Sequence, residues 1–128
     1  MSKILVVDDH PKITGIYRKL LERHGYQVIE ANDSHRATNL LITHGDVDVV
    51  LLDIRMPRVD GQMLYDVIHQ YDPNIRVIVT SVFSLDEQKR LILTADGYYD
   101  KSQNVAVLLA EVQKTASCGA IAATHGLA

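Results

Sequence analysis

The stretch Asp48-Val49-Val50-Leu51-Leu52-Asp53 decides the fold, because it is a continuous run of apolar residues between two carboxylates. Such runs are typical of central strands in a parallel sheet, where helices cover both faces. Residues 3–8 and 75–80 have the same character, and residues 27–31 and 97–100 are two further expected strands. These strands are of the kind that a layered α/β domain contains.

Five segments with apolar residues at helical spacing follow these strands. Their apolar positions are Ile13, Ile16, Tyr17, Leu20, Leu21 and His24; Ala37, Leu40 and Leu41; Leu64, Val67, Ile68 and Tyr71; Leu85, Leu91 and Ile92; and Val105, Leu108, Leu109 and Val112. Ser84 and Glu87 form a capping box for the fourth segment. The alternation predicts βα units. We therefore expect an α/β fold, a flavodoxin-like doubly wound (βα)5 domain with a five-stranded parallel sheet in strand order 2-1-3-4-5.

Length and composition are those of one globular, cytoplasmic domain. With 128 residues, of which 47% are apolar and 23% charged, the chain can bury a core without cross-links, and its single cysteine, Cys118, has no internal partner. No apolar run approaches the ~20 residues of a membrane-spanning helix, so no membrane association is expected. The 13 basic and 16 acidic residues form no basic run, which argues against direct nucleic-acid binding.

Carboxylates follow two strands that are neighbours in the expected order. Asp8 and Asp9 end the first strand and Asp53 ends the third, so all three reach the carboxyl edge of the sheet, where such folds bind ligands. Two unit charges about 4 Å apart repel by roughly 4 kcal/mol at an effective dielectric constant of 20. The cluster therefore needs a cation, and Mg²⁺ is the candidate because it binds one or two carboxylates together with waters and phosphate oxygens.

A hydroxyl and an ammonium group reach the same edge. Thr80 ends the fourth strand and Lys101 follows the fifth. A carboxylate can attack phosphorus to form an aspartyl-phosphate, while a metal and an ammonium neutralise the phosphoryl oxygens and a hydroxyl donates a hydrogen bond. Asp53 is the candidate nucleophile, and Asp8 and Asp9 are the candidate metal-binding pair.

The chain resembles the receiver domain of two-component response regulators over residues 3 to about 116. Four segments carry the resemblance in order: Ile4-Leu5-Val6-Val7-Asp8-Asp9, Val50-Leu51-Leu52-Asp53-Ile54-Arg55-Met56-Pro57-Arg58-Val59-Asp60-Gly61, Val77-Ile78-Val79-Thr80 and Gly97-Tyr98-Tyr99-Asp100-Lys101. The chain departs from the family at Ser81, where Ala or Gly is usual, and at Ser102, where Pro is usual. Residues 1–116 are expected to form the receiver domain, and residues 117–128 a short frayed tail or the start of a linker.

The resemblance implies a phosphoacceptor and a metal site. Asp53 would be phosphorylated from a phosphohistidine of a sensor histidine kinase or phosphotransfer protein, with slow autodephosphorylation and no other enzymatic activity. Mg²⁺ would be held by Asp9, Asp53 and the backbone carbonyl of Arg55, with Asp8 acting through water. Thr80 and Lys101 would contact the phosphoryl group.

The resemblance also implies a switch. Thr80 would move toward the phosphoryl group and Tyr98 would turn inward, which changes the surface formed by the fourth helix, fifth strand and fifth helix. That surface would control a downstream protein partner or output domain, and a homodimer through it is a further expectation. Arg55 and Val82 occupy positions that tune water access to the phosphoryl group, and we expect Val82 to slow hydrolysis.

Other functions stay open from the sequence. A receiver that binds partners without phosphorylation has the same fold. A hydrolase with an aspartyl nucleophile would place Asp-x-Asp after its first strand, where this chain has adjacent Asp8 and Asp9. A flavodoxin-like cofactor carrier would need a phosphate-binding loop there, and these carboxylates would repel a phosphate. The sequence leaves the cognate kinase, the output partner and the extent of the complete protein open.

Overall fold

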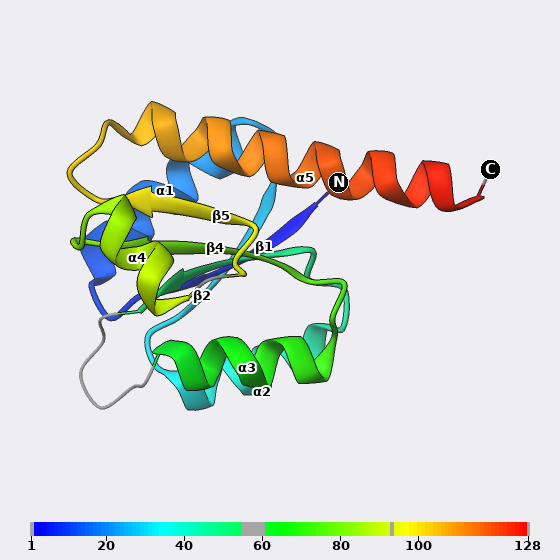
Figure 1. Cartoon of the computed structure of the whole chain (residues 1–128), viewed down its shortest axis with the longest axis horizontal. Coiled ribbons are helices and arrows are strands. Elements are labelled where there is room, and N and C mark those ends of the chain that lie inside the picture. The colour runs from blue at the N-terminus through cyan, green and yellow to red at the C-terminus, as the bar shows by residue number, and fades with distance from the viewer. Residues whose placement is uncertain (1, 55–60, 93, 128) are drawn as a thin grey trace.

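The computed structural model describes residues 2–54, 61–92 and 94–127, with side chains to residue 116. Five parallel strands form one sheet in the order β2-β1-β3-β4-β5, as predicted (Figure 1). The strands are β1 (Lys3–Val7), β2 (Gln27–Ala31), β3 (Val49–Asp53), β4 (Arg76–Ser81) and β5 (Gly97–Asp100). The helices are α1 (Pro11–Arg23), α2 (Ser34–His44), α3 (Gly61–Tyr71), α4 (Leu85–Leu91) and α5 (Val105–Leu127).

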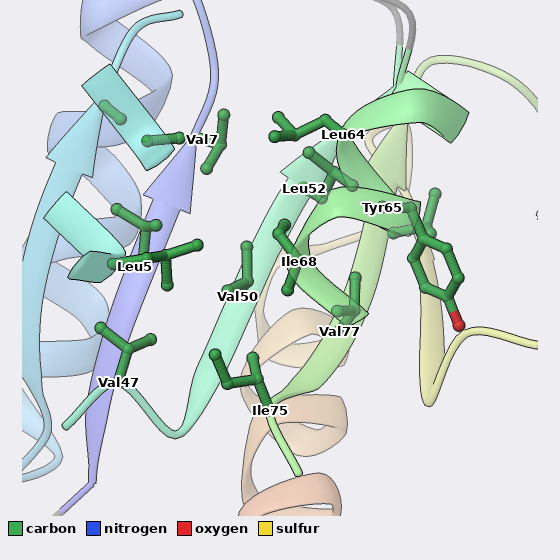
Figure 2. Packing of buried hydrophobic residues seen from close by; sticks show 14 of the residues in the cluster. Leu5, Val7, Val47, Val50, Leu52, Leu64, Tyr65, Ile68, Ile75 and Val77 are labelled. Atoms are coloured by element: carbon green, nitrogen blue, oxygen red, sulfur yellow. The ribbon is translucent and has the colours of Figure 1, made fainter. Parts of the chain in front are cut away.

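Helices cover both faces of the sheet, with α1 and α5 on one face and α2 and α3 on the other (Figure 1). Successive residues of a strand point to opposite faces. Thus Val50 and Leu52 join the cluster beneath α2 and α3, which contains Leu41 and Ile68 (Figure 2). Their neighbours Val49 and Leu51 join the cluster beneath α1 and α5, with Tyr17, Leu21 and Leu108. Double coverage explains why the strand sequences do not alternate between apolar and polar residues.

Local signals mark the ends of several helices. The Asp33 carboxylate accepts a 2.7 Å hydrogen bond from the Arg36 amide at the start of α2. Gly45, at φ 69°, ends that helix in the left-handed conformation that glycine adopts without strain. The Ser84 hydroxyl accepts from the Glu87 amide at the start of α4, which confirms this half of the expected capping box.

Two expectations about helices differ from the structure. Helix α5 continues to Leu127, whereas a short frayed tail or the start of a linker was expected from residue 117. Ile16 and Tyr71 are about half exposed although their spacing predicted burial, because α1 and α3 bury narrower stripes centred on residues such as Tyr17 and Ile68. Within the described residues, no helix is long and apolar enough to cross a membrane.

Candidate functional site

The parallel register brings the predicted site residues to one edge of the sheet. Asp53, the last residue of β3, is paired with Thr80 of β4. Ser81 of β4 is paired with Asp100 of β5, and the Lys101 amide donates to the Ser81 carbonyl over 2.8 Å. Asp8 directly follows β1, and β1 pairs with the edge of β3 that is opposite to β4. The strand order therefore gathers groups from β1, β3, β4 and β5 that are far apart in the sequence.

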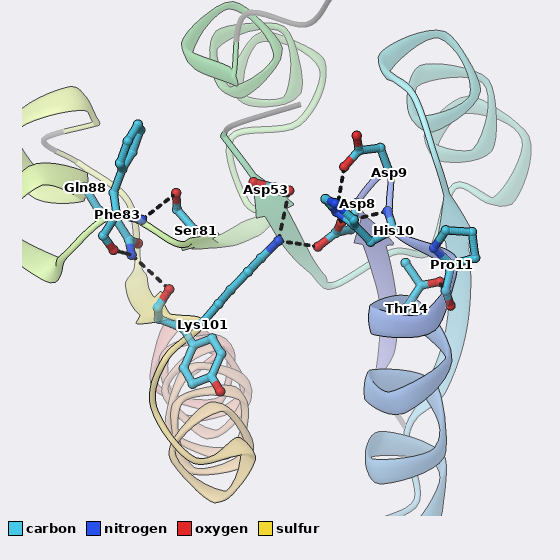
Figure 3. Close-up of polar contacts among 11 residues, drawn as sticks. Asp8, Asp9, His10, Pro11, Thr14, Asp53, Ser81, Phe83, Gln88 and Lys101 are labelled. Atoms are coloured by element: carbon cyan, nitrogen blue, oxygen red, sulfur yellow. Dashed lines mark hydrogen bonds and ion pairs between the residues drawn. The ribbon is translucent and has the colours of Figure 1, made fainter. Parts of the chain in front are cut away.

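Lys101 lies between two buried carboxylates (Figure 3). Its Nζ donates to Asp8 Oδ2 over 2.7 Å and to Asp53 Oδ2 over 3.0 Å. The side chains of Asp8 and Asp53 are 1% and 2% exposed, so water screens these contacts weakly. Burial lowers the pKa of Lys101, but the hydrogen bonds and charges of the two aspartates outweigh burial and raise that pKa above its ordinary value. Lys101 is therefore a cation throughout the neutral range.

His10 contacts the other acidic groups of the cluster. Its Nδ1 lies 3.1 Å from Asp8 Oδ1 and 2.9 Å from Asp9 Oδ1, and its backbone amide donates to Asp8 Oδ1 over 3.0 Å. Asp9 Oδ1 is a buried atom that nevertheless accepts no well-directed hydrogen bond from the residues that the structure describes. A buried carboxylate oxygen of this kind is suited to bind a metal cation.

Three carboxylates and one imidazole offer ligand atoms within 4.8 Å of one another, from Asp8, Asp9, His10 and Asp53. The carboxylates outnumber the single ammonium of Lys101, so the cluster retains negative charge. Together with the absence of a well-directed hydrogen bond to Asp9 Oδ1 among the described residues, this excess fits a hard divalent cation such as Mg²⁺, for which oxygen atoms are the preferred ligands. The donor set thus agrees with the expected metal site, and Arg55 lies outside the described residues.

Thr80, Val82 and Tyr98 are the remaining predicted residues that the structure describes. Thr80 is 1% exposed, whereas Val82, in the loop after β4, is 61% exposed. Tyr98 is partly buried, its hydroxyl donates to the Ile92 carbonyl, and its ring centroid lies 5.9 Å from Lys89 Nζ. Tyr98 therefore packs toward α4, away from solvent.

Tyr17 and Gln88 are neighbours of the site that the sequence analysis did not assign to it. The Tyr17 ring meets the Tyr99 ring edge-on at 6.4 Å. Burial, followed by the nearby Tyr99, Asp8 and Asp53, raises the pKa of Tyr17 far above its usual range, so this phenol stays neutral beside the carboxylates. Gln88 is fully buried in α4. No pattern in the sequence identifies Tyr17 or Gln88 as a neighbour of the site. For His10, by contrast, its position directly after Asp8-Asp9 was a signal that could have placed it in the cluster.

This fold and this edge cluster define a flavodoxin-like signalling domain. The chain belongs to the response regulator receiver domain family, whose model matches residues 4–113. The resemblance seen in the sequence, and the fold that it implies, are thereby confirmed.

Two regulatory proteins are similar to most of this chain. The response regulator GtcR of Aneurinibacillus migulanus is 37% identical over 117 residues, which are 88% of this chain and 47% of that protein. The transcriptional regulatory protein CpxR of Escherichia coli is 35% identical over 114 residues, 88% of this chain and 48% of that protein. The chain thus spans about half the length of these relatives.

Among solved structures, the response regulator TrrA of Thermotoga maritima, in complex with Mg²⁺-BeF, superposes with a TM-score of 0.80 at 30% identity. The match covers 90% of this chain and 99% of that one.

Proposed function

We propose that this receiver domain is a phosphorylation-controlled switch whose phosphoacceptor is Asp53. The phosphoryl donor is the phosphohistidine of a sensor histidine kinase or phosphotransfer protein. The observation that carries the proposal is the Lys101 ammonium, held at 2.7 Å and 3.0 Å between the buried carboxylates of Asp8 and Asp53. A buried carboxylate beside a fixed cation can form an acyl phosphate, because the cation neutralises part of the new charge.

The reaction exchanges one bond to phosphorus for another. A carboxylate oxygen of Asp53 forms the new O–P bond, the N–P bond of the phosphohistidine breaks, and the histidine nitrogen keeps the electron pair. Lys101 neutralises charge on the equatorial oxygens, and the Thr80 hydroxyl donates a hydrogen bond to one of them. Mg²⁺, when bound by Asp8, Asp9, Asp53 and the Arg55 carbonyl, supplies further positive charge to the phosphoryl oxygens. Slow hydrolysis of the acyl phosphate resets the switch.

The proposed output surface is that of α4, β5 and α5. Tyr98 on β5 contacts α4 through the Ile92 carbonyl and Lys89, so a movement of Thr80 toward a phosphoryl group can be passed to this surface. Leu91, Val105 and Val107 leave apolar side chains exposed on α4 and α5. Such residues suit a protein partner, an output domain or a second copy of the chain. Partner binding and phosphorylation then favour each other reciprocally.

The first test is phosphorylation by a small donor. Incubation with acetyl phosphate and Mg²⁺ is expected to add one phosphoryl group per chain, detected by intact mass. The adduct is expected to be absent in Asp53→Asn and without metal, because the amide is a poor nucleophile and the carboxylates then repel the donor. If neither acetyl phosphate nor a phosphohistidine donor labels the wild type, the chain is a phosphorylation-independent interaction module.

A second test concerns Val82, which is 61% exposed in the loop after Thr80. We propose that this apolar side chain, together with Arg55, limits access of water to the phosphoryl group. Val82→Glu is expected to shorten the lifetime of the acyl phosphate by about threefold or more, because a carboxylate can orient an attacking water. Val107→Glu on α5 is the matched control and is expected to keep the wild-type lifetime. Equal lifetimes for all three proteins would remove Val82 from this role.

A further inference from the structure

Gln88 is a polar residue enclosed in the interior, with 0% of its surface exposed. Its Nε2 donates to the Phe83 carbonyl over 2.9 Å and to the Tyr99 carbonyl over 2.9 Å (Figure 3). Both partners are backbone acceptors, so the orientation of the amide follows from its surroundings: the nitrogen must face them. One side chain of α4 thereby joins the loop after β4 to strand β5.

The other end of the same amide has no such partner. Gln88 Oε1 is buried and accepts no hydrogen bond from the part of the chain that the structure describes. A buried acceptor without a donor is unfavourable, and an apolar residue of similar size would avoid that penalty. The structural contribution of Gln88 therefore lies in its two N–H donors.

The two carbonyls belong to the segments that carry Thr80 and Lys101. Phe83 is three residues after Thr80, and its amide donates to Ser81 Oγ over 3.1 Å, which closes the loop between them. Tyr99 is two residues before Lys101 in β5. The hydrogen bonds that Gln88 donates to Phe83 and Tyr99 reach neither β1 nor β3, which position Asp8, Asp9 and Asp53.

We propose that Gln88 is a positioning residue for phosphoryl transfer, a role that rests on the proposed function of the site. Its amide sets the position of the Thr80 loop relative to the Lys101 strand, so that the hydroxyl and the ammonium reach one phosphoryl group together. The metal-binding carboxylates do not depend on it. Loss of the two donors therefore slows phosphoryl transfer and leaves the affinity for Mg²⁺ unchanged.

The test compares Gln88→Met, which keeps the side-chain length and removes both donors, with wild type. The rate of labelling by acetyl phosphate is expected to fall about tenfold, as for the loss of a stabilisation worth one to two buried hydrogen bonds. The Mg²⁺ affinity, measured by titration calorimetry, is expected to stay within about twofold, since its ligands sit on other strands. Gln70→Met, the same change at an exposed position of α3, is the control and is expected to leave both quantities unchanged.

A double-mutant cycle separates positioning from general damage. In a Thr80→Ala background, Gln88→Met is expected to cost about threefold or less, because the hydroxyl that Gln88 positions is already gone. A tenfold loss in both backgrounds, an unchanged rate in the single variant, or a parallel loss of Mg²⁺ affinity would each overturn the proposal. If Gln88→Met does not fold, Gln88→Leu is used with the same expectations. Absence of labelling in the wild type would instead overturn the proposed function itself.

Discussion

Lys101 is the residue on which the charge balance of the site depends. Its Nζ lies 2.7 Å from Asp8 and 3.0 Å from Asp53, two carboxylates that would otherwise face each other in a weakly screened environment. Removing one partner from a buried charge cluster leaves the other charges unpaired. This costs more stability than replacing the whole cluster by apolar residues. Lys101 is thus expected to contribute to the stability of the free domain.

The raised pKa of Lys101 predicts how this contribution depends on pH. A group whose pKa is higher in the folded than in the unfolded state stabilises the fold fully below the unfolded value, and the effect is lost as the pH rises through the folded value. The ordinary lysine pKa is 10.5, and that of Lys101 lies above it. In metal-free buffer, Lys101→Met is therefore expected to lower the free energy of unfolding by about 3 kcal/mol at neutral pH.

The same difference is expected to stay constant to about pH 9 and to shrink only in stronger alkali. Urea unfolding of both proteins across this range measures it, and tyrosine ionisation, common to both, cancels in the difference. A difference that already decreases between about pH 7 and about pH 9 would contradict the assignment.

Individual site residues differ in how well the sequence predicts them. Asp8, Asp53 and Thr80 could be predicted because each ends an apolar strand, and strand ends of a parallel sheet share one edge. Gln88 could not, because a glutamine in a short helix has no pattern that distinguishes a buried from an exposed position. Its burial depends on how α4 lies against β5, which is a tertiary contact.

At the level of elements, Gly61 allows the start of α3 to lie close to the backbone after β3. A Cβ atom at this position would lie 2.6 Å from the Ile54 Cα, a backbone atom that cannot move aside cheaply. The first residue of α3 therefore packs directly against the chain leaving β3, immediately beyond Asp53. Close approach here is possible only without a side chain.

Two glycine substitutions test this contact. Gly61→Ala is expected to lower the free energy of unfolding by about 1 to 3 kcal/mol, as for overpacking of a closed site. Gly15→Ala lies within α1, where nothing occupies the space of the new Cβ, and is expected to raise stability by about 0.5 to 1 kcal/mol through helix propensity. Chemical denaturation gives both values, and equal effects at the two positions would show that the Ile54 contact does not matter.

Element boundaries agree with the sequence wherever the signal is local. Asp33 and Gly45 begin and end α2 through hydrogen bonding and backbone conformation within a few residues. Periodicity was the criterion for a helix and the apolar spacing of α5 ends at Val112, so the continuation of α5 to Leu127 was not predicted.

For the whole molecule, the negative edge cluster is expected to make stability depend on Mg²⁺. The carboxylates of Asp8, Asp9 and Asp53 lie close together. Among the lysine and arginine side chains that the structure describes, Lys101 alone forms ion pairs with this cluster. Charge repulsion in the folded state is relieved by a bound cation, and any ligand that binds only the folded state stabilises it. At Mg²⁺ about 100 times above its dissociation constant the gain is about 2.7 kcal/mol.

Asp9→Asn is expected to separate charge repulsion in the folded state from stabilisation by Mg²⁺, because the variant weakens both. Without metal the variant is expected to be more stable than wild type, because one of the repelling charges is gone. With Mg²⁺ its gain is expected to be smaller than that of wild type, since a ligand is lost. Thermal unfolding with and without Mg²⁺ measures both, and Asp66→Asn on the exposed side of α3 is expected to behave as wild type. A full Mg²⁺ response in Asp9→Asn would remove Asp9 from the metal site.

The amino-acid sequence by itself determined the α/β class, the strand order and the carboxylates at the sheet edge. The α/β class and the carboxylates follow from apolar runs, helical spacing and strand ends, whereas the strand order follows from the resemblance to a flavodoxin-like fold. Only the tertiary structure decided that Lys101 bridges Asp8 and Asp53 and that Gln88 joins the Thr80 loop to β5. Such contacts join side chains to distant segments, and their geometry depends on how the elements pack, which no pattern along the chain encodes.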